Sequence, residues 1–342
     1  MSSGLFYNIE TIMWFEKLTG FREDNPTQVR ANIEINGNKL ISKVNNAEFT
    51  FGKLEVSTLE TLINQAPLID IYKSKIQVSE VVGNIQTFHK EKESKGAFFQ
   101  AASQFNLLEM VTPYVSPESG VDIYENDYTQ GPACAIACGA GTIYRNYFAP
   151  VNNQTGQSAD NQIDCLKDIA IELENKKFSL WKMSNGYVLS SSEGLKNISQ
   201  QIKGKSKQEY EQLKNKLKIG LQWDTEVTIS ENKHLVSQAY CSGLPVAYSN
   251  VKSEYWEDFA RLILEATYEA TFFAALSNYN KTGNNKVFLT LVGGGVFGNK
   301  SQWIFDAIKK AIDKFSNTPL DIKIVSYGSS NLEVRAFVEA MK

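Results

Sequence analysis

The sequence predicts an α/β fold in three layers, with helices on both sides of a central sheet. Short runs rich in Val, Ile and Phe alternate with segments of helical periodicity. The segment 253–279 is apolar around most of its circumference, as in a largely buried helix. The chain closes as strand 287–292, a glycine loop, helix 301–314, strand 321–327 and helix 331–341. This order favours ligands at the carboxyl ends of the strands.

Composition and charge exclude several classes of protein for this chain. The chain has 342 residues, of which 42% are hydrophobic and 21% charged, so a sizeable core is available. The net charge of −3 argues against general nucleic-acid binding. No apolar run is long enough to cross a membrane, and no cysteine lies in a C-x-x-C pair. We therefore expect a cytoplasmic protein with no metal and no nucleic-acid or membrane partner.

The first half of the chain is expected to begin with a helix at 5–22. Strands follow across 30–56 with a hairpin turn at Asn36-Gly37, then a helix at 57–66 that starts at Ser57 or Thr58. A second helix is expected at 78–95 and a buried strand at 96–102.

The second half is expected to contain a helix after Pro132 and another near 162–175. A hairpin at 178–191 turns at Asn185-Gly186, and 193–217 is a polar helix. The segments 218–228 and 235–249 are strands joined by a polar turn.

The glycine loop 293–298 invites three interpretations. It satisfies G-x-G-x-x-G, but the dinucleotide fingerprint needs an acid at the tip of the second strand, where this chain has Ser326-Tyr327. A P-loop needs a lysine where Asn299 stands. The third interpretation is a family resemblance: "LVGGGVFGN" resembles the loop with which macro domains wrap the diphosphate of ADP-ribose.

The macro-domain resemblance covers most of residues 45–330. "GAFFQAASQFNLLE" resembles the strand that ends in N-A-A-N, "DYTQGPACAIACGAGTIYRN" resembles the first phosphate loop and its helix, and "GKLE" falls where G-D-I-T is expected, with Lys53 in place of the aspartate. The resemblance implies a single domain 1–342 with a mixed central sheet, an N-terminal extension 1–45 and insertions at 66–95 and 150–215. The ADP-ribose contacts that it implies are Gln100, Asn106, Gln130, Gly293, Gly294, Gly295, Val296, Phe297, Gly298, Asn299 and Tyr327.

An acidic loop replaces the family's glycine-rich first phosphate loop. It carries Asp122, Glu125 and Asp127, and in this respect the chain resembles the divergent MavL-like branch of ADP-ribosyl-arginine hydrolases. Paired carboxylates stabilise an oxocarbenium-like transition state and move protons during glycosidic cleavage. The resemblance implies that these three acids are catalytic, and we expect Asp127 to be the most important of them. It also implies that no cofactor is needed and that the substrate is an ADP-ribosylated protein.

Other interpretations stay open at this point. The acids could form a solvated loop in which Asp127 only caps the following helix. The chain could bind ADP-ribose without turnover, or it could be a nicotinamide-nucleotide enzyme that uses the glycine loop. Cys241 with His234 suggests a nucleophile and base, but no acid is placed in the sequence to orient the histidine.

Overall fold

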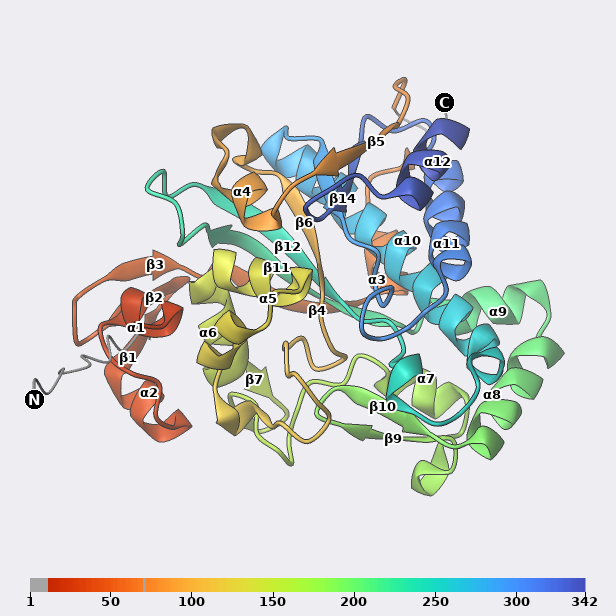
Figure 1. Cartoon of the computed structure of the whole chain (residues 1–342), viewed down its shortest axis with the longest axis horizontal. Coiled ribbons are helices and arrows are strands. Elements are labelled where there is room, and N and C mark those ends of the chain that lie inside the picture. Colours follow the sequence, from red (N-terminus) through yellow and green to blue (C-terminus); the bar gives the residue numbers. More distant parts are fainter. Residues whose placement is uncertain (1–11, 70–71, 342) are drawn as a thin grey trace, which may run out of the picture.

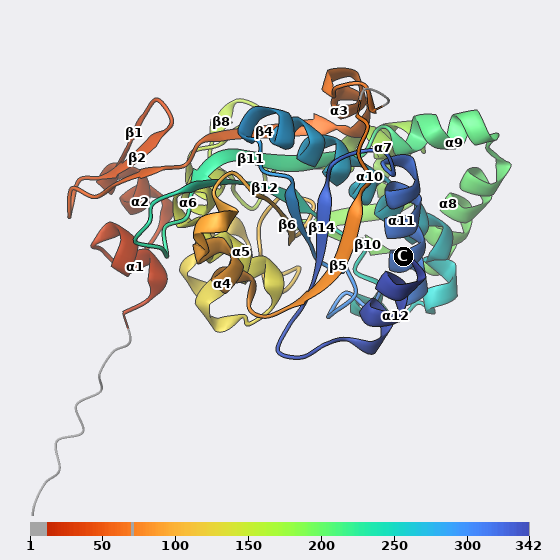
Figure 2. The ribbon, with the colours of Figure 1, turned by 90° about the horizontal axis from the view of Figure 1, so that it is seen from above.

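A computed structural model describes residues 12–69 and 72–341, and a seven-stranded sheet runs through its centre in the order β4-β11-β12-β6-β13-β14-β5 (Figures 1 and 2). The β4-β11 and β11-β12 pairs are antiparallel, and every pair from β12 to β5 is parallel. The predicted mixed sheet is therefore confirmed. The strands are β4 (Lys53–Thr58), β5 (Gln77–Val82), β6 (Phe98–Ala102), β11 (Lys218–Glu226), β12 (Leu235–Cys241), β13 (Lys286–Leu289) and β14 (Asp321–Ser326).

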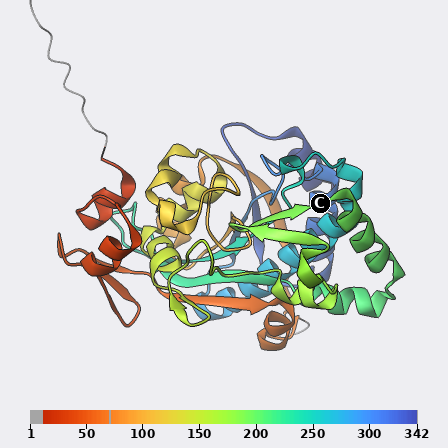
Figure 3. The same cartoon turned by 90° about the horizontal axis from the view of Figure 1, so that it is seen from below.

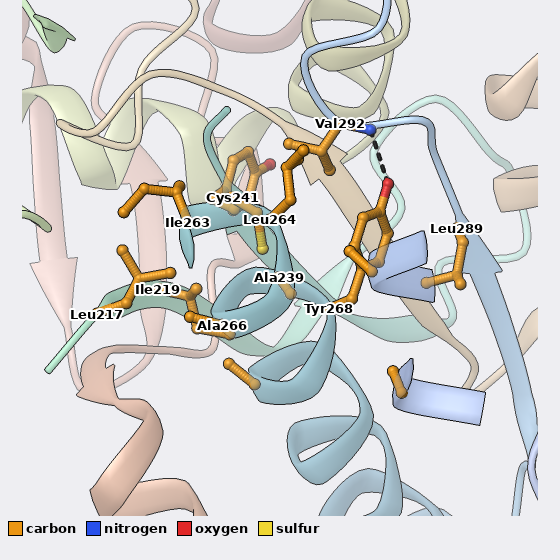
Figure 4. Packing of buried hydrophobic residues seen from close by; sticks show 14 of the residues in the cluster. Leu217, Ile219, Ala239, Cys241, Ile263, Leu264, Ala266, Tyr268, Leu289 and Val292 are labelled. Atoms are coloured by element: carbon orange, nitrogen blue, oxygen red, sulfur yellow. Dashed lines mark hydrogen bonds between the residues drawn. The ribbon is translucent and has the colours of Figure 1, made fainter. Parts of the chain in front are cut away.

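Helices cover both faces of this sheet, which confirms the predicted layering. Side chains alternate along β12: Gln238 donates a hydrogen bond to the Cys134 carbonyl on one face at 2.9 Å, whereas Ala239 and Cys241 face α10 on the other (Figure 4). The first face carries α4 (Ile85–Lys90), α5 (Gln130–Ala137) and α6 (Gly139–Tyr147). The second carries α10 (Glu257–Thr282), with α3 (Leu59–Gln65), α8 (Ser192–Gly204), α9 (Lys207–Lys214) and α11 (Ser301–Lys314) beside it.

The long helix α10 is the centre of the main core. Leu262, Ile263, Leu264 and Ala266 are fully buried, and Figure 4 shows α10 side chains packed toward Ile219, Ala239 and Leu289. Full burial of each large aliphatic side chain contributes about 1.5–3 kcal/mol. The buried carboxylates of α10 are paired, Glu265 with Lys310 at 2.6 Å and Glu269 with Lys214 at 2.8 Å.

A separate N-terminal unit lies at one end of the molecule (Figures 1 and 3). It consists of α1 (Trp14–Thr19), α2 (Pro26–Asn32), β1 (Ile33–Asn36), β2 (Lys39–Ser42) and β3 (Glu48–Thr50). Its apolar side chains form a second core together with residues of α5, α6 and the short 3-10 helix η4 (Asp122–Asn126). The acidic loop therefore packs against the N-terminal unit.

The remaining elements surround these layers. They are α7 (Lys167–Glu172), α12 (Leu332–Ala340), the small pair β7 (Pro150–Val151) and β8 (Gln154–Thr155), and the hairpin β9 (Trp181–Ser184) and β10 (Tyr187–Ser190), which is clearly seen in Figure 3. The predicted turn at Asn185-Gly186 is confirmed. Within the described residues, no helix is both long and apolar enough to cross a membrane.

The structure corrects three of the predicted helices. Residues 78–95 are not one helix, because Gln77–Val82 is strand β5, which pairs in parallel with β14, and the helix begins only at Ile85. The range 66–95 thus supplies an edge strand of the central sheet. Of the predicted helix 5–22, residues 5–11 lie outside the described residues, and α1 ends where Gly20 adopts φ 80°. The polar helix 193–217 is two helices, because Ser206 and Glu209 form a capping box.

Candidate functional site

A cavity of about 1040 Å³ opens at the carboxyl ends of the parallel strands β5, β6, β13 and β14. This is where α/β sheets place their ligands. The glycine loop and the acidic loop form two of its walls. Its lining includes 83–86 after β5, 102–104 after β6, 109–111, the segment from Tyr124 to Ala133, 293–297 after β13, and 325–327 at the end of β14.

The glycine loop lines this cavity and contains main-chain N–H groups that are unpaired among the described residues. Gly293 adopts φ 73° and Gly298 φ 72°, and hydrogen bonds from Gly294 N to Leu291 O (2.9 Å) and from Gly298 N to Gly295 O (3.0 Å) fix the turn between them. Within the part of the chain that the structure describes, the N–H groups of Gly295, Val296 and Phe297 donate no hydrogen bond. Successive free amides in such a turn form an anion-binding concavity.

Two buried side chains hold this loop in place. The Tyr268 hydroxyl donates to Thr290 O at 2.8 Å and accepts from Val292 N at 2.9 Å, as Figure 4 shows for the second bond. The Asn299 amide donates to Leu244 O at 2.7 Å and to Gly293 O at 3.1 Å. Asn299 and Gly298 do not line the cavity. Asn299 was expected to contact ADP-ribose, but its amide hydrogen-bonds the loop to Leu244 instead.

Asp127 also lines the cavity. Its Oδ1 accepts a hydrogen bond from Thr129 N at 2.9 Å. Thr129, not Asp127, is the N-cap residue of α5, and no side chain caps that helix. The alternative in which Asp127 only caps the helix therefore does not describe the geometry.

The carboxylates of Asp122 and Glu125 accept hydrogen bonds from the first residues of helix α1. Glu125 Oε2 accepts from Trp14 N at 2.5 Å, and Asp122 Oδ1 accepts from Phe15 N at 3.3 Å. Both carboxylates thus meet the N-terminus of α1, where negative charge is stabilised by the helix dipole. Glu125 also lines the cavity, whereas Asp122 does not. Burial raises the pKa of Asp122, and the Phe15 hydrogen bond partly offsets this shift.

Glu23 of the N-terminal unit fixes the start of the acidic loop. Its Oε2 accepts from Val121 N at 2.8 Å and from Asp122 N at 2.6 Å, and its Oε1 accepts from the Tyr147 hydroxyl at 2.6 Å. Burial raises the pKa of Glu23, and these hydrogen bonds oppose the rise. No local sequence pattern connects Glu23 with the site, because almost a hundred residues separate it from Val121.

Besides Asn299, three side-chain amides were expected to contact ADP-ribose, and the structure brings one of these three to the cavity. Gln130 lines it, with Oε1 accepting from Ala102 N at 3.2 Å. Gln100 and Asn106 are fully buried and do not line it. Gln100 Nε2 donates to Thr271 Oγ1 at 2.8 Å and Asn106 Nδ2 donates to Gln162 Oε1 at 2.9 Å, so both amides are used inside the fold.

Aromatic residues lie at the walls and rim of the cavity. Phe297 is buried against Tyr187 and Tyr248, with ring centroids 5.3 and 5.5 Å away. Tyr327 and Tyr128 line the cavity but are 72% and 86% exposed. Large exposed rings beside a cavity offer stacking surfaces to a base or a cation.

Two cavity-lining features were missed by the sequence analysis. One is Gly83-Asn84-Ile85 after β5, whereas the "GKLE" segment lies on β4, at the opposite edge of the sheet. The Gly-Asn-Ile order could have been found, because it matches Gly-Asp-Ile of the expected G-D-I-T with one substitution. The other is Glu109, 4% exposed, for which no sequence pattern was a signal.

The cysteine alternative has no support in the structure. Cys241 is buried and lies 3.6 Å from Thr271 Oγ1, and burial raises the pKa of its thiol to about 12. His234 does not face it, because its Nε2 contacts the His89 carbonyl at 2.8 Å. A reactive cysteine needs a lowered pKa and access to substrate.

Comparisons with known proteins give a weak structural likeness. No family model matches the chain, and neither does any curated protein sequence. The chain is similar to the structure of poly(ADP-ribose) glycohydrolase from Deinococcus radiodurans in complex with ADP-ribose. The two sequences are 7% identical, the alignment covers 84% of this chain and 94% of that chain, and the TM-score is 0.45. It is also similar to the enzyme from Thermomonospora curvata bound to the inhibitor ADP-HPD, with 9% identity, 93% and 97% covered, and a TM-score of 0.45. Scores below 0.5 at such identity establish neither family nor activity.

Proposed function

We propose that the chain binds ADP-ribose in this cavity and removes it from modified protein side chains, arginine being preferred. The main observation that supports the proposal is that the glycine loop and the acidic loop line the same cavity. Free N–H groups of Gly295, Val296 and Phe297 form one wall, and the carboxylate of Asp127 lies in the other. An anion-binding turn and a carboxylate are the two parts that cleavage of a diphosphate-bearing glycoside requires.

In this scheme the diphosphate lies against the glycine loop. The adenosine end extends toward Gly83-Asn84-Ile85 and Tyr327, at the ends of the neighbouring strands β5 and β14. The distal ribose then lies between Phe297 and the start of α5, where Asp127 accepts a proton from the attacking water. Asp122 and Glu125 hold the loop through the N-terminus of α1.

The preference for arginine follows from the charge and shape of the acidic wall. Asp127 and Glu125 both line the cavity, and a guanidinium pairs well with carboxylates. The exposed ring of Tyr128 adds a surface on which a guanidinium can stack.

The proposal is tested by incubating the protein with peptides that carry ADP-ribose on arginine, serine or glutamate. We expect release of free ADP-ribose, fastest from arginine, and unchanged release after dialysis against a chelator, since the scheme uses no metal. Micromolar binding of ADP-ribose without release from any peptide would identify a reader instead. Binding of NAD but not ADP-ribose would favour a nicotinamide-nucleotide enzyme.

A further inference from the structure

The proposed function leaves the buried carboxyl group of Glu109 without a role. Glu109 lines the cavity although its side chain is only 4% exposed. Its Oε1 is buried and has no hydrogen-bond partner among the described residues. An unpaired buried polar group is costly, so its presence beside a ligand cavity points to a partner that arrives with the ligand.

The surroundings place this carboxyl group against the first turn of α5. Glu109 N donates to the Tyr124 hydroxyl at 2.9 Å, which fixes the backbone. An ideal Cβ on Gly131 would lie 2.5 Å from Glu109 Oε2, so only glycine leaves room for this approach. Gly131 follows Gln130 directly and lies four residues after Asp127, so Glu109 and Asp127 face the same part of the cavity.

Within the part of the chain that the structure describes, no ion pair holds Glu109 in its ionised form. The buried guanidinium of Arg145 donates to Leu107 O at 3.2 Å and Thr142 Oγ1 at 3.0 Å, and lies 3.5 Å over the Tyr240 ring. Among the described residues, no salt bridge within 4.0 Å joins the Arg145 guanidinium to the Glu109 carboxyl group. Burial raises the pKa of Glu109 well above its ordinary value, the charge of Asp127 raises it further, and Arg145 opposes the rise. The groups that face Glu109 electrostatically are Tyr124, Asp127, Cys134, Arg145, Tyr187 and Tyr240.

We propose that Glu109 is the general acid of the reaction and Asp127 the general base, an inference that rests on the proposed function. The bond between C1″ of the distal ribose and the arginine nitrogen breaks, and its electron pair stays on nitrogen, which takes the Glu109 proton. Water forms the new bond to C1″ and gives its proton to Asp127. Free ADP-ribose and arginine leave, and solvent returns a proton from Asp127 to Glu109.

The leaving group provides a test that a purely structural role would not satisfy. Guanidine is a poor leaving group unless it is protonated, whereas 4-nitrophenolate leaves without a proton. We expect Glu109→Gln to lower kcat on ADP-ribosyl-arginine peptide by about 10²–10⁴-fold. On the 4-nitrophenyl glycoside of ADP-ribose, the same variant should change kcat by less than about threefold, because no acid is needed there. Glu109→Asp, which keeps the proton on a shorter side chain, should lie between the wild type and the glutamine variant on arginine.

Two further measurements keep the test decisive. ADP-ribose affinity by calorimetry should stay unchanged in Glu109→Gln, which shows that the variant is folded. In the wild type, the alkaline limb of the kcat/KM profile should appear with the arginine substrate and be absent with the nitrophenyl substrate, a comparison that needs no variant.

The inference is overturned if Glu109→Gln slows both substrates equally, slows neither, or if both wild-type profiles share the alkaline limb. A wild type that binds ADP-ribose but cleaves neither substrate overturns the proposed hydrolase, and the role of Glu109 with it.

Discussion

The two walls of the cavity are built in different ways. The glycine wall consists of main chain, and hydrogen bonds among Gly293 to Asn299 fix its turn, while Tyr268 holds Thr290 and Val292 just before it. The acidic wall consists of side chains on the short 3-10 helix η4 and, for Asp127, directly after it. It is held by Glu23, Trp14 and Phe15, which lie about a hundred residues earlier.

In the proposed mechanism, this difference separates the binding of ADP-ribose from its release. A diphosphate needs fixed N–H groups, which one local turn supplies. Proton transfer needs a carboxylate held at one place beside the bond that breaks, and an exposed loop alone would not hold it. The N-terminal unit supplies that rigidity. We therefore expect changes in the acidic wall to act on kcat and changes in the glycine wall to act on ADP-ribose affinity.

Among the variants that distinguish the roles of the two walls, we expect Asp127→Asn to have the largest effect. The amide keeps the size and the Oδ1 acceptor for Thr129 N but cannot take a proton from water. Release of ADP-ribose from arginine peptide should fall by about 10³-fold, with ADP-ribose affinity unchanged. Single-turnover kinetics and calorimetry measure the two quantities. Release at the wild-type rate would remove Asp127 from the mechanism.

A smaller effect should follow from detaching the acidic wall. Glu23→Ala leaves Val121 N, Asp122 N and the Tyr147 hydroxyl without their buried acceptor, so the free energy of unfolding should fall by about 2–3 kcal/mol. Release of ADP-ribose should slow by more than ADP-ribose affinity weakens. Glu34→Ala, at an exposed position on β1, is the matched control and should change neither. Equal losses of rate and affinity in Glu23→Ala would contradict the separation of the walls.

The raised pKa of Glu109, which lies on the acidic side of the cavity, should make the free energy of unfolding depend on pH. Its pKa is raised well above 4.5, so the folded protein keeps a proton that the unfolded chain releases. Its contribution to stability is full below about pH 4.5 and is lost as pH rises toward the folded pKa, by up to about 1.4 kcal/mol per pH unit. Urea unfolding across this range should therefore give a flatter curve for Glu109→Gln than for the wild type. Parallel curves would show that Glu109 does not hold a proton in the folded state.

We expect the smallest effect from a change at Tyr327, where the proposed scheme places the adenosine end of ADP-ribose. Tyr327→Ala should weaken ADP-ribose binding by about five- to tenfold, since base–aromatic stacking contributes about 1–3 kcal/mol. Tyr114→Ala is the matched control, because Tyr114 is 88% exposed and does not line the cavity. If both variants bind like the wild type, adenosine lies elsewhere.

The parts of the molecule that sequence could predict were those set by local patterns. The strand, glycine loop and helix ending at Lys314 follow from periodicity and from glycine spacing, and the structure confirms the elements. Strand β5 was misassigned because "VSEVV" satisfies both periods and only its pairing with β14 decides between them. The anchoring of Asp122 and Glu125 by α1, and the burial of Glu109, arise from contacts between distant segments that no local pattern specifies.

The central claim is that the free amides of the glycine loop bind the diphosphate, and Gly295→Ala tests it most directly. An ideal Cβ at Gly295 meets no atom within 4 Å, so the fold should keep its melting temperature. The new methyl group lies beside the free N–H groups and should obstruct a phosphate. In calorimetry, we predict micromolar ADP-ribose binding to the wild type and at least about tenfold weaker binding to Gly295→Ala, the loss of roughly one charge-assisted hydrogen bond. Equal affinity of the two proteins, or no binding to the wild type, would contradict the account.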